Sequence, residues 1–167
     1  MRATDIERAK SDCRSRPDRR LVLRIHPDPV LRSLCEPVEE FDTALADLAD
    51  EMLAVMRANN GIGLAAPQVG ISRQLLVAEV AGQTLSLANP QILDRSGASE
   101  LPEGCLSLPG QTVMIMRDRA IRVLAYDLRG REVRIAASRL WARVIEHEID
   151  HLRGVLIIDR VEAVVPE

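Results

Sequence analysis

The stretch SRLWARVIEHEIDHLRG, residues 138–154, decides how this chain is organised. Its apolar residues recur at helical spacing and Gly154 is a typical residue just beyond a helix end, so the pattern predicts a helix over Ser138–Leu152. Within it, HEIDH (147–151) has the form H-E-x-x-H. Because side chains four residues apart lie one above the other, both imidazoles can bind one metal ion. Glu148 can then reach a metal-bound water as a general acid/base.

The residues around the two imidazoles favour a metal site over a chance match on an exposed helix. Leu140 and Val144 share the stripe of His147 and His151, and an apolar surrounding helps to exclude bulk water. His also occurs only three times in 167 residues, which makes an accidental pair at this spacing improbable. The adjacent stripe is expected to pack in the core and comprises Trp141, Ile145 and Leu152.

A catalytic site of the zinc type needs a third protein ligand, and this ligand has to come from upstream. Ile157 occupies the position where the longer motif H-E-x-x-H-x-x-G-x-x-H would place another His. Cys105 lies in the tight segment EGCLSLP (103–109), and from local sequence it is either a ligand or a buried hydrophobe. The missing ligand favours ligation. Of the other cysteines, Cys35 is predicted to be a packing residue and Cys13 a bystander.

The rest of the chain predicts an α+β fold in which antiparallel β-sheets surround the central H-E-x-x-H helix. A second, N-terminal amphipathic helix is expected over Thr43–Ala58, capped by Asp42 or Thr43 and stopped by NNG (59–61). Gly130 is expected to close a hairpin in a left-handed conformation. Short strands are expected at Gln74–Val80, Thr84–Ala88, Ile121–Tyr126 and Val133–Ala136, and Val155–Ile158 could be a last strand.

Composition limits the function and the compartment. With 22 basic and 25 acidic residues the net charge is −3, which argues against a generally basic nucleic-acid-binding protein. The sequence has no 18-residue apolar run for a membrane span, and its first twenty residues lack the apolar region of a secretory signal. We expect a charged extension over 1–20 and a single catalytic metallohydrolase domain over 21–167. An odd number of cysteines suits a reducing cytoplasm.

The segment GIGLAAPQ (61–68) matches the dinucleotide pattern G-x-G-x-x-A. That fingerprint needs a strand before it and a helix beginning within it, whereas here a predicted helix precedes it, so no nucleotide cofactor is expected. The glycines more simply allow a close backbone approach to a substrate. Gln68, if it lies beside a metal, can donate to an oxyanion.

Three motifs together, GIGLAAPQ (61–68), EGCLS (103–107) and HEIDH (147–151), resemble the peptide deformylases in order and spacing, and HPDPVLR (26–32) resembles the start of that family. The resemblance covers about Leu21 to Arg160. It implies a bacterial, cytoplasmic metallohydrolase that removes the formyl group from the initiator N-formylmethionine of nascent proteins. It also implies that one divalent metal, natively Fe(II) with zinc, nickel or cobalt as possible replacements, is bound by Cys105, His147 and His151.

The same resemblance assigns roles to the remaining site residues. Glu148 takes the proton of the attacking water, and the Gln68 amide and the Leu106 backbone N–H help to hold the oxyanion. Asp150 either orients the site through Arg117 or forms a plain surface salt bridge. The substrate-binding residues are expected to be Ile62, Gly63, Gly104, Leu140 and Val144.

Three departures from the family pattern stand out. Glu146 occupies a position that is usually Gln, where a carboxylate could alter the metal affinity or the local charge, or face solvent. Trp141 is expected to reshape the back of the pocket. The chain also stops soon after Arg160, without the C-terminal helix that some members use at the ribosome exit region, so docking by that route is not expected. The alternatives are an endopeptidase and a non-catalytic or altered-specificity deformylase-like paralogue.

Overall fold

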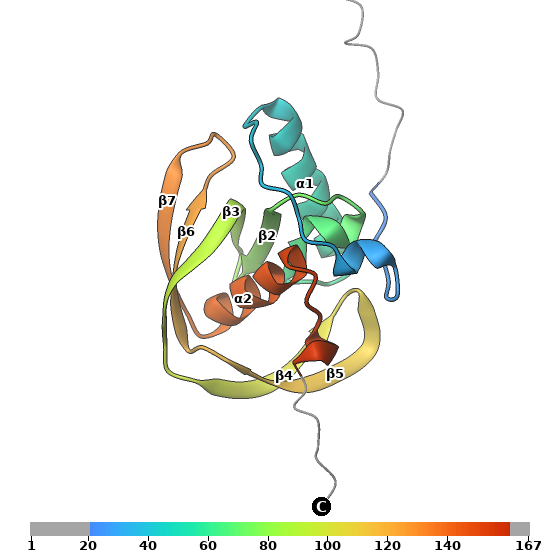
Figure 1. Cartoon of the computed structure of the whole chain (residues 1–167), viewed down its shortest axis with the longest axis vertical. Helices are drawn as coiled ribbons and strands as arrows, with labels where there is room; N and C mark the ends of the chain where they lie inside the picture. The colour runs from blue at the N-terminus through green and yellow to red at the C-terminus, as the bar shows by residue number, and fades with distance from the viewer. Residues whose placement is uncertain (1–20, 161–167) are drawn as a thin grey trace, which may run out of the picture.

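In the computed structural model, which describes residues 21–160, helix α1 spans Thr43–Ala58. Asp42 caps its start, since the Oδ1 atom of Asp42 accepts a hydrogen bond of 3.0 Å from the Leu45 N–H. The helix ends at Ala58, and Asn59 is its C-terminal cap. Its apolar face lies against β2 (Figure 1) and buries Leu45, Ala49, Met52, Leu53 and Met56.

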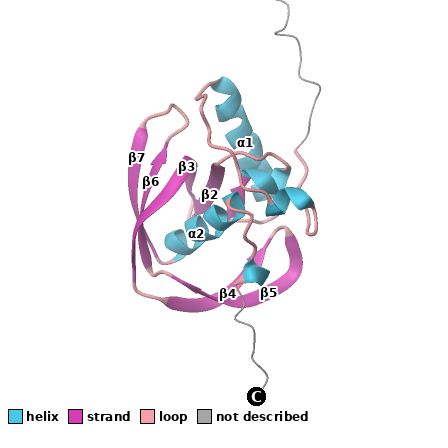
Figure 2. Cartoon of the chain, in the orientation of Figure 1, coloured by secondary structure: helices cyan, strands magenta, loops and turns pink. Residues whose placement is uncertain are grey.

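Five antiparallel strands form the larger sheet in the order β1-β2-β3-β6-β7. The expected α+β class with antiparallel sheets is therefore confirmed (Figure 2). The sheet bends where β3 shifts register against β6, and it curves around the central helix α2 (Figure 1). Gly130 closes the β6–β7 hairpin at a φ of +74°, as the sequence predicts. The strands are β1 (Gly63–Ala65), β2 (Leu75–Val80), β3 (Gln83–Ser96), β6 (Ala120–Tyr126) and β7 (Glu132–Ser138).

A two-stranded sheet, formed by β4 (Ser99–Cys105) and β5 (Leu108–Arg117), was not predicted from the sequence. Most side chains of β4 are exposed, so the alternation that marks a half-buried strand is missing. Pro102 lies within β4, where it is tolerated because β4 pairs only with β5 among residues 21–160. This hairpin lies below α2 in Figure 1 and brings Cys105 towards it.

Helix α2 spans Leu140–Leu152, two residues shorter at its start than predicted, because β7 continues to Ser138. Ile145, Ile149 and Leu152 pack into the core beneath the larger sheet. The prediction of a possible last strand at Val155–Ile158 is wrong. Residues Ile157–Asp159 form a 3₁₀ turn, η4, in which Asp159 accepts a hydrogen bond from the Leu156 N–H. Two other short turns of this kind are η2 (Pro29–Arg32) and η3 (Ala66–Val69). No helix in the described part of the chain is long and apolar enough to span a bilayer.

Candidate metal centre and substrate groove

Three side chains from two elements bring a sulfur and two ring nitrogens together. The Sγ atom of Cys105, at the end of β4, lies 3.2 Å from Nε2 of His151, which lies 3.2 Å from Nε2 of His147. A tetrahedral ion with ordinary metal–nitrogen and metal–sulfur bonds would separate such donors by roughly 3.3–3.6 Å. One thiolate and two imidazoles in this arrangement therefore fit a divalent metal ion.

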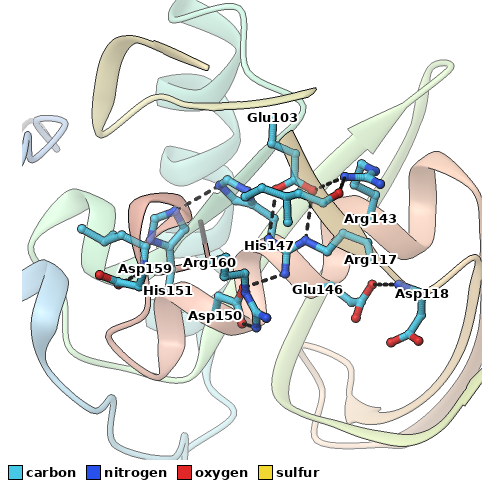
Figure 3. Close-up of polar contacts among 12 residues, drawn as sticks. Glu103, Arg117, Asp118, Arg143, Glu146, His147, Asp150, His151, Asp159 and Arg160 are labelled. Atoms are coloured by element: carbon cyan, nitrogen blue, oxygen red, sulfur yellow. Dashed lines mark hydrogen bonds and ion pairs between the residues drawn. The ribbon is translucent and has the colours of Figure 1, made fainter. Parts of the chain in front are cut away.

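Glu103 fixes the orientation of one of these imidazoles (Figure 3). Its Oε2 atom lies 3.0 Å from Nδ1 of His147, and both carboxylate oxygens accept hydrogen bonds from Arg117 at 3.0 and 2.9 Å. Burial would raise the pKa of Glu103, but the hydrogen bonds from His147 and Arg117 lower it to about 2. An ionised carboxylate can only accept, so His147 carries its proton on Nδ1 and turns Nε2 towards the other donors.

The pKa values of the two imidazoles are shifted in opposite directions in the metal-free protein. Burial would lower the pKa of His147, but its hydrogen bonds to Cys105 and Glu103 raise that pKa to about 10. Burial and the positive charge of His147 hold the pKa of His151 well below its usual value. Because metal ligands must be deprotonated where they bind, a bound cation would displace the proton on Nε2 of His147.

Glu148 lies against the backbone of β1. Its side chain is 3% exposed, burial raises its pKa to about 7, and Oε2 has no hydrogen-bond partner among the described residues. A Cβ atom at Gly63 would lie 2.3 Å from Oε1 of Glu148 and 2.9 Å from a methyl group of Val144. Only glycine therefore lets β1 pack directly on this carboxylate.

The amide of Gln68 is held in one orientation. Gln68 lies in η3 and is 1% exposed, and its Oε1 atom accepts a hydrogen bond of 2.8 Å from the Ala65 N–H. Its Nε2 atom donates to Oγ of Ser107 at 3.2 Å and to Sγ of Cys105 at 3.7 Å. The nitrogen, and not the oxygen, is therefore directed at the sulfur of Cys105.

A groove of about 760 Å³ passes over these groups. Ile62 and Leu140 are 46% and 47% exposed and lie at its apolar margin. His151 is the one predicted site residue that does not line it, since this side chain is 1% exposed beneath the groove. The other predicted site residues all line it: Ile62, Gly63, Gln68, Gly104, Cys105, Leu106, Leu140, Val144, His147 and Glu148.

Two of the residues that depart from the family pattern, Trp141 and Glu146, lie outside the groove. Trp141 does not line the groove; with Ile145 it lines a separate cavity of about 630 Å³ that residues of β3 and β7 also line, so its expected effect on the back of the pocket is wrong. Glu146 is 5% exposed and does not face solvent. It accepts hydrogen bonds from Arg95 at 2.6 Å and from the Asp118 N–H at 3.1 Å. Burial and the nearby Asp118 raise the pKa of Glu146 to about 7.

Asp150 contacts Arg117, and the alternative of a plain surface salt bridge is wrong. The distance from Arg117 Nη1 to Asp150 Oδ2 is 2.6 Å, and both side chains are buried. Arg160 also donates to Asp150 (Figure 3). Arg117 therefore joins the carboxylate of Glu103, beside His147, to that of Asp150, next to His151 in sequence.

Sequence reasoning missed Glu103 and Arg143 as parts of the site. The signal for Glu103 was its place two residues before Cys105, and the signal for Arg143 was its place one helical turn before His147 on an otherwise apolar stripe. Arg143 is buried and donates to Oε1 of Glu103 at 2.6 Å.

Comparisons with known proteins agree with this geometry. A family model described as polypeptide deformylase matches residues 21–166. A peptide deformylase from Halothermothrix orenii is 45% identical over 143 residues, covering 84% of this chain and 93% of that protein. The crystal structure of peptide deformylase from Thermotoga maritima superimposes with a TM-score of 0.83 at 41% identity, covering 85% of this chain and 97% of that one. A Synechococcus elongatus peptide deformylase in complex with actinonin gives a TM-score of 0.84 at 40% identity, with 90% and 84% coverage.

Proposed function

The chain belongs to the polypeptide deformylase family, and on that premise we propose how its own residues carry out the reaction. The enzyme removes the formyl group from N-formylmethionyl nascent peptides and releases formate. We assign this activity to residues 21–167 as one catalytic domain. The observation that carries the proposal is the convergence of one thiolate, two imidazoles and a buried carboxylate at a single groove, with His151 beneath its lining.

We assign the metal to Cys105, His147 and His151, whose donor atoms already lie at suitable separations. Fe(II) is the proposed native ion, with zinc, nickel and cobalt as replacements that the same mixed sulfur and nitrogen donors accept. When bound, the divalent metal lowers the pKa of a coordinated water and polarises the formyl oxygen.

Glu148 is the proposed general acid/base. It takes the proton of the attacking water and delivers it to the leaving amine, and its carboxylate lies against Gly63 in the lining of the groove. The amide N–H of Gln68 and the backbone N–H of Leu106 are the proposed donors to the oxyanion that develops on the formyl group. Gln68 is suited to this task because Ala65 and Ser107 fix the direction of its nitrogen.

The peptide is proposed to bind as an extended strand. In the described part of the chain β1 pairs only with β2, which leaves the edge of Gly63 available for backbone hydrogen bonds, with Gly104 on β4 across the groove. The methionine side chain would contact the apolar lining made by Ile62, Leu140 and Val144. Because the substrate is a nascent chain, we place the reaction in the bacterial cytoplasm, near the ribosome exit region.

Formate release from formyl-Met-Ala-Ser by anaerobically purified, iron-loaded protein tests the activity. Glu148→Gln should retain its metal and lose about 10²–10⁴-fold in turnover, because only the proton transfer is removed. Absence of formate release from metal-replete wild type would refute the proposal, and cleavage of internal bonds in unblocked peptides would identify an endopeptidase instead.

Metal analysis of two cysteine variants tests the ligand assignment. Cys105→Ala should lose most of its metal, whereas Cys35→Ala, altered at a buried core position away from the donors, should retain it. Equal metal content in the two variants would refute the three-ligand site. Actinonin, seen bound to the Synechococcus elongatus relative, should raise the Tm of the metal-loaded protein and leave that of Cys105→Ala unchanged.

A further inference from the structure

Arg143 is a buried arginine that joins helix α2 to both strands of the β4–β5 hairpin. Its side chain is 9% exposed. Nη2 donates to the backbone oxygen of Ser99 on β4 at 2.6 Å, and Nη1 donates to that of Ile115 on β5 at 3.1 Å. Nη1 also donates to Oε1 of Glu103 at 2.6 Å (Figure 3). One guanidinium therefore fixes two backbone oxygens and one carboxylate of the hairpin relative to α2.

The junction that Arg143 bridges also separates the metal donors. Cys105 comes from the hairpin, and both imidazoles come from α2. The hairpin shares no strand pairing with the five-stranded sheet in the described part of the chain, so side-chain contacts contribute to its placement against α2. Besides Arg143, the ion pair between Arg117 and Asp150 crosses the same junction.

Arg143 also completes the hydrogen bonding of Glu103. A carboxylate has about four lone-pair sites for hydrogen-bond donors. On Glu103, Oε2 contacts Arg117 Nη2 and His147 Nδ1, while Oε1 accepts from Arg117 Nε and Arg143 Nη1. With all four sites filled, the carboxylate cannot rotate, and the direction in which His147 presents Nε2 is fixed. Without Arg143, one site is empty and that constraint is weakened.

We propose that Arg143 is a positioning residue of the metal centre, acting on His147 through Glu103 and on Cys105 through the hairpin backbone. This inference rests on the metal site proposed above. It concerns a residue that contacts none of the three donors directly in the described hydrogen-bond network, and its effect is on how tightly and in what geometry the metal is bound.

Zinc affinity and the visible spectrum of the cobalt-loaded protein test the proposal without any assay of turnover. Arg143→Met keeps an unbranched apolar stem but removes the guanidinium, and should weaken zinc binding about 10–100-fold and shift the cobalt bands. Arg143→Lys keeps the charge but cannot reproduce the planar fork, so it should fall between Arg143→Met and wild type. If Arg143→Met fails to fold, Arg143→Lys decides. Wild-type zinc affinity and cobalt spectrum in the folded variant would overturn the proposal.

Two further variants separate positioning from general destabilisation. Val123→Ala creates a cavity in the larger sheet, and should lower the Tm while leaving zinc affinity unchanged. If Arg143 acts through Glu103, then Arg143→Met combined with Glu103→Gln should weaken zinc binding by less than the product of the two single effects. A full product, or a loss of affinity in Val123→Ala as large as in Arg143→Met, would overturn the proposal. Zinc binding by Cys105→Ala as tight as wild type would instead refute the metal site itself.

Discussion

Two ion pairs in this protein have the same contact distance and opposite surroundings. At the junction of α2 with the hairpin, Arg117 Nη1 lies 2.6 Å from Asp150 Oδ2, and the two side chains are 2% and 8% exposed. On strands β3 and β6, Arg122 Nη2 also lies 2.6 Å from Asp94 Oδ2, but these side chains are 70% and 54% exposed. Contact distance alone therefore does not tell which pair the fold and the site depend on.

The two regions differ in the exposure of their ion pairs to water. At the surface, solvent and salt screen the attraction, and each partner is well solvated when the pair opens. At the junction, Arg117 faces both Glu103 and Asp150, and removal of the cation would leave two carboxylates in a largely water-free environment. A buried network of this kind adds little net stability when intact, but it is costly to break and it holds its members in one arrangement. A metal centre requires this fixed arrangement of its surrounding residues.

The largest effect is expected from Arg117→Leu, which removes the cation shared by Glu103 and Asp150. We expect the free energy of unfolding of the metal-free protein, measured in urea, to fall by about 3–5 kcal/mol. Arg122→Leu is the matched control and should leave the urea midpoint unchanged. Similar midpoints for the two variants would show that burial does not separate these regions.

Lowering the pH should destabilise wild type more than Glu103→Gln, because acid protonates the buried carboxylate of Glu103. The pKa of Glu103 is about 2 in the folded protein and about 4.5 in the unfolded chain, so its contribution to stability is complete above pH 4.5 and is lost as the pH falls towards 2. Between pH 6 and pH 3, wild type should therefore lose about 2 kcal/mol more than Glu103→Gln, measured by urea unfolding of the metal-free proteins. Parallel losses in the two proteins would contradict the lowered pKa.

The ion pair between Glu146 and Arg95 is intermediate between the two regions, because its carboxylate is buried and its arginine is half-exposed. Its pKa is raised to about 7, chiefly by burial, so the ionised form destabilises the folded state at higher pH. Glu146→Gln removes that charge, and should raise the free energy of unfolding by about 1 kcal/mol at pH 8, with a smaller gain at pH 5. Urea unfolding at both pH values measures it. A loss of stability at pH 8 would mean that the Arg95 pair outweighs the cost of burial.

The two elements that meet at the buried junction differ in how far the sequence predicts them. Helix α2 is marked by its apolar period, by Gly154 beyond its end and by two His four residues apart, and all of these are local signals. Its partner, the β4–β5 hairpin, has mostly exposed side chains in β4 and a proline within the strand. Those features oppose a strand assignment, and only pairing with β5 and side-chain contacts to α2 make the segment extended.

The candidate site divides in the same way. Most of the predicted residues that face the groove belong to short motifs, so they can be identified directly from the sequence. Ten of the eleven predicted site residues line that groove. Arg143 and Glu103 are 40 positions apart, and Arg117 and Asp150 are 33 apart. Such pairings depend on the three-dimensional placement of the hairpin. The contact of Arg117 with Asp150 was one of two open alternatives, and the role of Arg143 had no local signal beyond its spacing from His147.

The smallest effect is expected at the edge strand β7, where Arg134 contacts Glu132 at 3.1 Å with side chains 71% and 48% exposed. Arg134→Ala should change the free energy of unfolding by less than about 0.5 kcal/mol, because both groups remain hydrated when the pair is lost. Zinc affinity should also stay at the wild-type value, since β7 contributes no donor to the metal centre. Urea unfolding and zinc competition on the same preparation measure both quantities. A weakening of zinc binding in Arg134→Ala would mean that an exposed charge outside the junction also affects the metal centre, and burial would then not separate the two regions.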